Sequence, residues 1–566
     1  MLSIIIIWFY ILAICLIYGY GSAALLRIIL KGADYDRLPC SLIIILGLCL
    51  ISAIAGYLSL FIKIGLTANI IIIFGALLIT AVYYHEIINL VRLGFQRLFA
   101  INKCILILYL LSFLFILIKS TETPSSFDTG LYHAQAIRWI EEYPVVPGLG
   151  NLHARLAFNS AWFLPNALFG FSFLKLQPCH AVNGLFLLII VFISLTGLYN
   201  LIKGQGNFSN ILRSCICIPA IFVFKDNLSS PTPDIPAALL ICLTFIYYLQ
   251  LQEKDAEIPP EFLSLYLVIL ATMAITIKLS ALPLGFFLVA LMSREIAGRR
   301  PANALVMVGA ALFLLLPFVL RNIWLSGYLA YPLPGLDLFN FDWQIPAPEV
   351  RTMTQIIKDF ARDPQGAAVL LPVKGAFYWL PTWWRQTLAD YGTKLEKIFL
   401  PVLLIMLSCL VQLIRTKCYK IDLQEISKDK VIYLTAFAGL AFWFLTAPDL
   451  RFGLGFIIVA PIIIFMPFLK AGDYQVSAWF PWALGLLLLY FLVVFGAKDI
   501  RAVGPRLWLP APYPQEPLAI KEIQGRKVNF PLENVMKCWY APLPCAGYPG
   551  KFAFRGETLQ DGFKAR

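Results

Sequence analysis

The sequence has few charged residues and few histidines, and it lacks the short motifs of several large enzyme classes. Only 14% of its 566 residues are charged and four are histidine, whereas soluble domains typically carry about 25% charged residues. It contains no P-loop, no G-x-S-x-G elbow, no H-E-x-x-H pair and no dinucleotide-binding fingerprint. These absences argue against an ATP-driven pump and a serine hydrolase.

Basic residues are in excess, but they do not form a nucleic-acid-binding pattern. The formal net charge is +13, and no basic stripe with interleaved aromatic residues follows any predicted helix or strand. Many of the lysines and arginines lie instead in short loops between apolar runs. We therefore expect no nucleic-acid partner.

Long apolar runs dominate the chain, which is 60% hydrophobic. Uninterrupted apolar stretches of roughly 18 or more residues are typical of transmembrane helices. The first of them opens the chain and is too long for a cleaved signal peptide, so we expect it to be retained. The sequence predicts an all-α polytopic membrane protein with about fourteen transmembrane helices, over 3–26, 41–61, 66–85, 104–119, 181–201, 211–224, 235–250, 262–277, 280–293, 303–320, 397–414, 431–446, 453–469 and 480–497.

The short loops fix an expected orientation. One set of alternate loops carries most of the basic residues, for example Arg92 and Arg97, and the positive-inside rule assigns that set to the cytoplasm. The two long loops 120–180 and 321–396 and the tail 498–566 are then non-cytoplasmic, as are both termini.

Loop 120–180 holds the first candidate site residues. Ser125 and Asp128 have capping-box spacing, so a helix is expected to begin there. Its apolar residues recur on one side, which predicts an amphipathic helix along the membrane surface. Asp128 either caps this helix or accepts a proton or binds a cation. His133 is expected to be a hydrogen-bonding site residue, whereas a metal site of Asp128 with the loop's histidines has poor helical spacing.

Four later residues also lie at the outer ends of predicted helices. Asp234 opens one helix, as a site residue or an N-cap. Lys278 lies between two apolar runs, where it either contacts a phosphate or snorkels to the surface. Arg321 could hold an anionic head group. Arg451 either pairs with Asp449 or reaches a phosphate.

The tail carries two cysteines in a polar, proline-rich segment. Cys538 and Cys545 differ in this respect from most of the other cysteines, which lie inside apolar runs. Because the tail is expected outside the cytoplasm, where disulfides persist, we predict a Cys538–Cys545 disulfide. Two unrelated thiols are the alternative.

Taken together, these features resemble the GT-C superfamily of membrane glycosyltransferases. The resemblance spans about 104–452 and is carried by the helix 104–119 leading into Asp128, Tyr132 and His133, by Pro233-Asp234-Ile235-Pro236, by Lys278-Leu279-Ser280, by the segment from Arg321 to Pro332, and by Pro448-Asp449-Leu450-Arg451-Phe452. A narrower resemblance, in 127–142, 148–153 and the cysteine-containing tail, is to an uncharacterised bacterial membrane-protein family without a known reaction.

The GT-C resemblance implies a module over 104–497, preceded by extra helices in 1–103 and followed by the tail 498–566. It implies transfer of a sugar from a polyprenyl-phosphate carrier at the outer face of a bacterial inner membrane, with membrane lipids as the other partners. In such a reaction Asp128 is the general base or the ligand of a divalent metal ion, which is the one cofactor in question.

The same resemblance assigns the remaining site residues to the substrate. Lys278, Arg321 and Arg451 would offset charge on the leaving phosphate, and His133 and Asp234 would bind the substrate. The chain departs from the superfamily pattern because its first acid follows roughly the fourth helix and has no adjacent acidic partner. A surface-polysaccharide polymerase or ligase and a multi-pass transporter are the competing interpretations.

Overall fold

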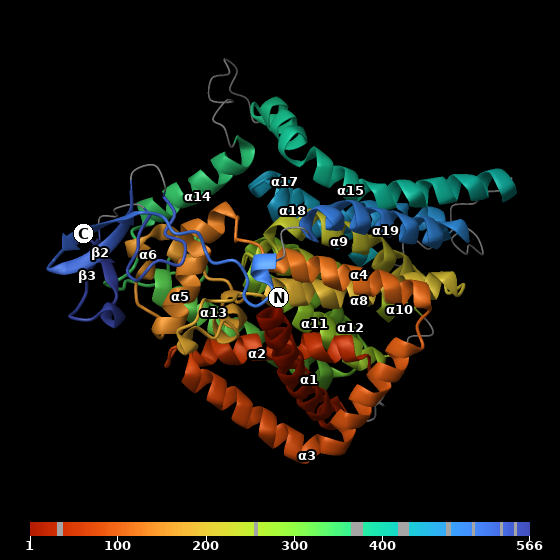
Figure 1. Cartoon of the computed structure of the whole chain (residues 1–566), viewed down its shortest axis with the longest axis horizontal. Coiled ribbons are helices and arrows are strands. Elements are labelled where there is room, and N and C mark those ends of the chain that lie inside the picture. The colour runs from red at the N-terminus through yellow and green to blue at the C-terminus, as the bar shows by residue number, and fades with distance from the viewer. Residues whose placement is uncertain are drawn as a thin grey trace.

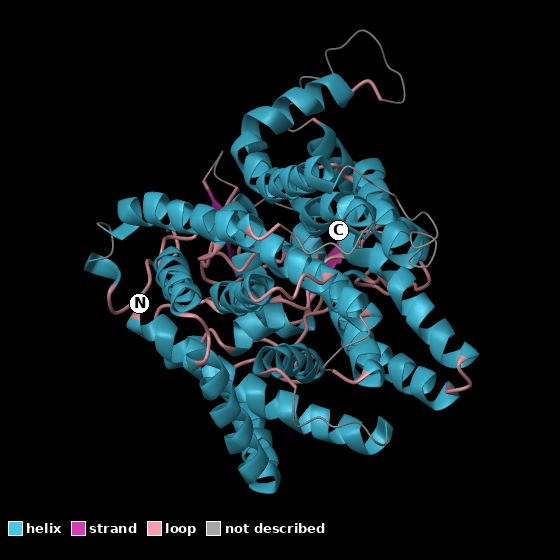
Figure 2. Ribbon diagram, turned by 90° about the vertical axis from the view of Figure 1, so that its right-hand side faces the viewer, coloured by secondary structure: helices cyan, strands magenta, loops and turns pink. Residues whose placement is uncertain are grey.

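The computed structural model describes residues 1–30, 38–253, 258–363, 377–416, 430–470, 477–500, 504–532, 536–547 and 552–566. Two segments predicted to be non-cytoplasmic lie partly outside these ranges. They are the second long loop, at 364–376, and the tail, at 501–503, 533–535 and 548–551. The described chain is mostly helical, and helices make up nearly all of the ribbon in Figure 2.

The helices that follow one another along the membrane body are α1 (Leu2–Leu30), α2 (Cys40–Leu58), α3 (Leu66–Phe99), α4 (Lys103–Ser120), α8 (Val182–Ile202), α9 (Phe208–Phe224), α10 (Asp234–Gln252), α11 (Pro260–Ile277), α12 (Gly285–Ala297), α13 (Pro301–Ser326), α15 (Leu380–Thr416), α17 (Lys430–Thr446), α18 (Leu450–Lys470) and α19 (Trp479–Ile500). Each of the fourteen predicted segments lies within one of these helices or overlaps most of it. Eleven helical segments of the described chain are long and apolar enough to cross a membrane. The protein is thus a helical, polytopic membrane protein, and the count of about fourteen spans stays a prediction.

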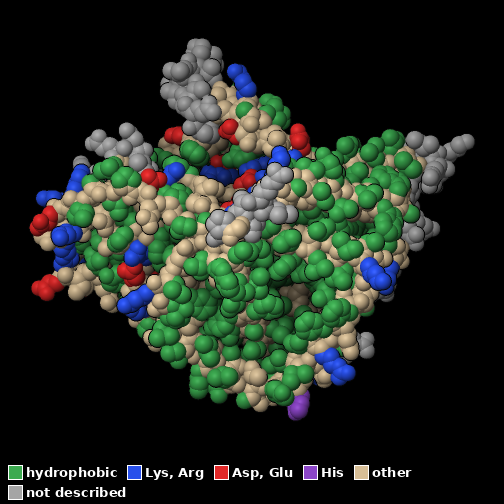
Figure 3. All heavy atoms as spheres, viewed as in Figure 1, with side chains coloured by type: hydrophobic (Ala, Val, Ile, Leu, Met, Phe, Trp, Pro, Cys, Tyr) green, Lys and Arg blue, Asp and Glu red, His purple; other side chains and the backbone are tan. Residues whose placement is uncertain are grey.

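Burial separates the central helices from the peripheral ones. In the most apolar window of α10 and of α11, 89% of the residues are buried, against 22% in α3. Exposed residues in the first half of α3, such as Ile70, Phe74 and Leu78, are apolar, as is typical of a helix that crosses a membrane, and α3 runs along the lower edge of the molecule in Figure 1. In the view of Figure 3 the lower body is mostly hydrophobic, and charged side chains gather along the upper and left parts.

The first two helices cross at a pair of glycines. A Cβ atom on Gly19 would lie 1.9 Å from the carbonyl oxygen of Ile43, and one on Gly47 would lie 1.8 Å from that of Cys15. Small residues at such crossings let two membrane helices approach backbone to backbone. Neither glycine can therefore carry a side chain without moving α1 away from α2.

The non-membrane part gathers at one end, on the left of Figure 1. It contains the π-helical turn η1 (Thr129–His133), the short helices α5 (Ala134–Glu142), α6 (Leu149–Leu152) and α7 (Phe163–Leu168), the 3₁₀ turn η2 (Ala154–Ala157), the amphipathic α14 (Ala347–Arg362), and the strands β1 (Leu518–Ile523), β2 (Arg526–Pro531), β3 (Phe552–Phe554) and β4 (Phe563–Ala565). The 3₁₀ turn η5 (Leu279–Leu284) lies elsewhere, between α11 and α12. β1 pairs with β2 and β3 with β4, both antiparallel. The predicted all-α class therefore describes the membrane body, and the tail, for which no secondary structure is predicted, adds four short strands.

Candidate functional site

Six charged side chains from five separate segments of the chain meet where several central helices begin or end. Arg451 lies 2.9 Å from an oxygen of Asp128 and 3.1 Å from an oxygen of Asp449, and Arg155 lies 3.6 Å from the other oxygen of Asp128. Lys278 pairs with Asp234. We call these six residues the charged cluster; it holds three carboxylates and three cations.

Helix ends position the members of the cluster. Asp128 directly precedes η1, Asp234 is the first residue of α10, and Lys278 follows the last residue of α11. Arg451 lies in the first turn of α18. The side chains of the six residues are between 6% and 27% exposed, so water screens them less than it screens a surface pair. The structure therefore brings together Asp128, Asp234, Lys278 and Arg451, four of the site residues that the sequence predicts.

Three residues here are not among the site residues that the sequence predicts: Arg155, which belongs to the cluster, and Tyr391 and Phe452, which contact it. The hydroxyl of Tyr391 lies 3.3 Å from Asp449, and the ammonium group of Lys278 lies 4.0 Å from the ring centroid of Phe452, within the range of a cation–π interaction. Arg155 carried a signal, because it is the one cation in the otherwise neutral segment 148–162.

His133 and Tyr132 lie beside the cluster. The ring nitrogen Nδ1 of His133 is 3.1 Å from the hydroxyl of Thr129. The centroids of the Tyr132 and His133 rings are 4.3 Å apart. Burial lowers the pKa of His133 to about 4, although the nearby Asp128 and Asp234 act in the opposite direction. Burial and the charge of Asp128 raise the pKa of Tyr132 well above its ordinary value. At neutral pH His133 is therefore uncharged and Tyr132 keeps its proton.

Stability is expected to fall on acidification because of two buried histidines. Burial lowers the pKa of His133 and of His153 from 6.5 to about 4. Between these pH values the unfolded chain binds a proton that the folded protein excludes, so stability is lost as the pH falls from 6.5 to 4, by about 3 kcal/mol for each histidine. Unfolding of the detergent-solubilised protein at a series of pH values measures this. His133→Gln should make the free energy of unfolding depend less steeply on pH between 4 and 6.5. An unchanged dependence would contradict the lowered pKa of His133.

A helical turn begins near Ser125 as expected, but the capping box is wrong. The hydroxyl of Ser125 donates to the backbone oxygen of Asp226, and Asp128 makes no side-chain capping hydrogen bond, because its carboxylate is held by Arg451 and Arg155. Helix α5 does not have a free polar side, and its position along a membrane surface stays a prediction. Seven of its nine residues are buried, Gln135 and Glu141 among them, because the C-terminal tail covers its polar side.

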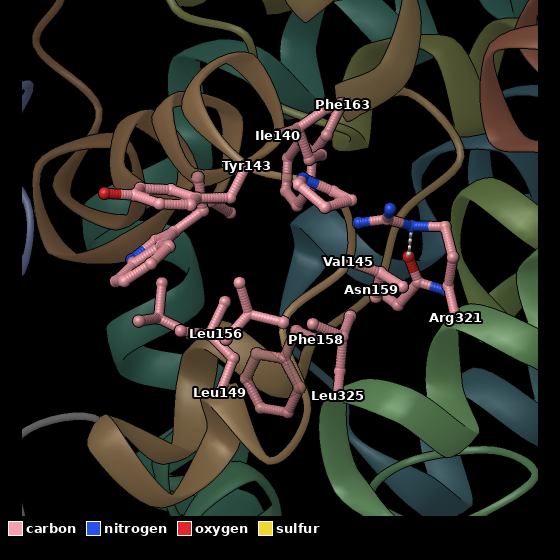
Figure 4. Close-up of a pocket in the computed structure, with 14 residues that line it drawn as sticks. Ile140, Tyr143, Val145, Leu149, Leu156, Phe158, Asn159, Phe163, Arg321 and Leu325 are labelled. Atoms are coloured by element: carbon pink, nitrogen blue, oxygen red, sulfur yellow. Dashed lines mark hydrogen bonds between the residues drawn. The ribbon is translucent and has the colours of Figure 1, made fainter. Parts of the chain in front are cut away.

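Arg321 lies outside the charged cluster. Its guanidinium donates to the hydroxyl of Ser59 at 2.7 Å and to the amide oxygen of Asn159 at 3.3 Å, and within the described ranges no carboxylate forms an ion pair with it. Figure 4 shows this guanidinium at one side of a pocket with apolar walls, among them Ile140 and Leu325, and with about 370 Å³ of empty space that includes its open mouth.

The other predicted ligands do not assemble a metal site. His180 bonds the hydroxyl of Tyr513 at 2.6 Å and lies 3.4 Å from Glu141. In the part of the chain that the structure describes, no group of three or more histidine, cysteine, aspartate or glutamate side chains has the arrangement of a metal site. Asp128 faces two arginines instead.

The two tail cysteines are bonded to each other. Cys538 and Cys545 form a disulfide whose Cα atoms are 6.1 Å apart, the pairing expected from the sequence. The loop that this bond closes contacts η1 and α5, so it lies next to the turn that carries Asp128.

Comparison with known proteins yields a family but no function. No curated protein and no solved structure matches the chain. One family model does match, over residues 1–458, which includes every residue of the charged cluster and stops before the tail. The chain belongs to the family described as Domain of unknown function (DUF8201).

Proposed function

We propose that this protein is a membrane glycosyltransferase that moves a sugar from a polyprenyl-phosphate carrier to a cell-surface glycan or lipid. The observation that carries the proposal is the assembly of Asp128, Asp234, Lys278 and Arg451, from four separate elements, into one partly buried cluster. These are residues that the GT-C resemblance assigns to the site. A purely structural protein gains little from such a cluster, because desolvating six charges costs about as much as their pairing returns.

The cluster contains the two functions that inverting sugar transfer needs. An acceptor hydroxyl oxygen attacks the anomeric carbon, its proton passes to the carboxylate of Asp128, and the bond between the anomeric carbon and the phosphate oxygen breaks. The leaving polyprenyl phosphate keeps the electron pair. Arg451 and Lys278 stabilise its growing charge, since preorganised cations act most strongly where water is scarce.

The ion pairs of the substrate-free protein fit this scheme. Arg451 holds Asp128 and Asp449 at once, so a donor phosphate that approaches Arg451 competes with Asp128 for the same guanidinium. Engagement of the phosphate then releases the Asp128 carboxylate toward the acceptor. The catalytic base is thus freed when the donor is bound, which limits transfer to the loaded site.

A strain that lacks the protein should accumulate the donor. In the proposed setting, a bacterial inner membrane with the cluster on the non-cytoplasmic face, deletion removes one sugar from a surface glycan and raises the level of the corresponding polyprenyl-phosphate sugar. Mass spectrometry of both fractions measures this. An unchanged glycan and lipid profile would contradict the proposal. If vesicles from the deletion strain lose movement of the sugar lipid across the membrane and no sugar transfer is found, a transporter is favoured instead.

A further inference from the structure

The loop closed by the Cys538–Cys545 disulfide is docked on the segment that carries Asp128 and His133. The side-chain amide of Gln135 donates to the backbone oxygens of Trp539, at 3.1 Å, and Ala541, at 2.9 Å. Arg138 donates to the backbone oxygen of Tyr540 at 2.6 Å and covers its ring. The loop therefore satisfies the polar side of α5, some 400 residues earlier in the chain.

One contact reaches the Asp128 turn itself. The backbone N–H of Trp539 donates to the carbonyl oxygen of Gly130 at 2.8 Å. Gly130 lies in η1, whose π-helical register adds a residue to the turn between Asp128 and His133. Such turns are rare and intrinsically weak, and they persist where surrounding contacts hold them. The loop supplies one of these contacts.

The indole of Trp539 also requires a glycine at this position. A Cβ atom on Gly130 would lie 2.9 Å from the Trp539 ring and 3.0 Å from Lys537, closer than side chains pack. Trp539 is buried against Ala134 and Tyr513. The fit between the loop and η1 is thus specific in shape as well as in hydrogen bonding.

Further polar and aromatic contacts anchor the loop on its other sides. The hydroxyl of Tyr540 donates to Glu141, and its ring stacks on Tyr513 at a centroid distance of 5.7 Å. The amide of Asn529 in β2 donates to the backbone oxygen of Pro542 at 2.9 Å. Because these contacts converge on an eight-residue segment, the disulfide that closes the segment restricts all of them together.

We infer that the Cys538–Cys545 loop is a positioning element for the charged cluster: it fixes the π-helical turn and so sets where Asp128 and His133 point. The effect on catalysis rests on the proposed function, but the effect on the turn does not. Opening the disulfide loosens the loop, frees the Gly130 carbonyl and lets η1 relax, while Lys278, at the end of α11, and Arg451, in α18, keep their places.

Hydrogen exchange of the full-length protein in detergent tests the inference. Reduction by a water-soluble phosphine moves two electrons to the disulfide, with two protons from water, so that two thiols form and the phosphine becomes its oxide. Amide exchange over 129–135 should then rise about tenfold, as expected for the loss of one or two hydrogen bonds, and exchange over 237–250 in α10 should not change. Thiol alkylation with mass detection confirms that the bond has opened.

Two variants test whether the raised exchange comes from the loop or from another effect of the phosphine. Cys538→Ser with Cys545→Ser should show the raised exchange without the phosphine and no further response to it. Gly130→Ala should raise exchange over the same residues with the disulfide intact, whereas Gly309→Ala, where an added Cβ has nothing within 4 Å, should not. Unchanged exchange over 129–135 after confirmed reduction would overturn the inference, and so would an equal rise throughout the chain.

A kinetic measurement distinguishes positioning from general stability. If the protein transfers sugar as proposed, reduction should lower kcat about tenfold or more while the KM for the donor changes little, because the phosphate-binding cations lie on other elements. A parallel rise in KM would contradict a positioning role. If no transfer is found at all, the exchange result still decides the inference.

Discussion

Asp128→Asn is expected to reduce sugar transfer by about 10²–10⁴-fold, the usual contribution of a general base. Asparagine has the same shape and its amide oxygen can still accept the hydrogen bond from Arg451, so the turn stays in place while the proton acceptor is lost. The measurement is the initial rate of transfer from a polyprenyl-phosphate sugar by purified protein, or the surface-glycan profile of a complemented deletion strain.

The matched control for this substitution is Asp342→Asn. Asp342 is also paired with an arginine, Arg555, at 2.8 Å, but its side chain is 56% exposed and it lies away from the cluster. It should leave the rate unchanged. Normal expression of Asp128→Asn together with undiminished transfer would remove the basis of the proposed mechanism.

Arg451→Gln is expected to destabilise the folded protein by about 3 kcal/mol, because removing one member of a buried ion pair leaves uncompensated charge behind. Here two carboxylates depend on the same guanidinium, and the side chains of Asp128 and Asp449 are only 17% and 6% exposed. Arg155 remains near Asp128 at 3.6 Å, so the loss is partial there. Thermal or chemical unfolding in detergent measures the change.

Two comparisons sharpen this prediction. Arg555→Gln breaks a pair of nearly equal length at the surface and should cost less than about 1 kcal/mol. Adding Asp128→Asn to Arg451→Gln should restore part of the lost stability, because it removes one of the two orphaned charges. If the surface and cluster substitutions have equal effects, the cluster is more hydrated than its burial indicates.

The sequence predicts four members of the cluster because they lie at helix ends that the loop charges assign to one side of the membrane. Asp234, Lys278 and Arg451 each adjoin an apolar run, so the predicted topology puts them on a common face. The residues with which they pair are harder to predict. The sequence allows either Asp449 or a phosphate as the partner of Arg451. For Asp128 the local spacing suggests a helix cap, whereas the structure has a tertiary ion pair with α18.

The tail and Arg321 show what a single sequence does not encode locally. The polar side of α5 predicts a membrane-surface helix, since nothing near Gln135 or Glu141 indicates that residues 539–541 of the tail cover them. Arg321 was grouped with the phosphate ligands by its motif, whereas the structure turns it toward Ser59 and Asn159. Both outcomes depend on contacts between segments that are distant along the chain.

The position of the tail also orders the events of biosynthesis. The backbone N–H groups of Leu2 and Ser3 donate to the oxygens of Leu507 and Trp508, and that of Trp539 donates to Gly130. The start of the first helix therefore lacks these partners until residues 507 and 508 have been made, and the Asp128 turn lacks the N–H group of Trp539 until the chain extends past residue 539. The ion pairs of the charged cluster join residues 128 to 451, so they can form before the loop that supports the Asp128 turn has been made.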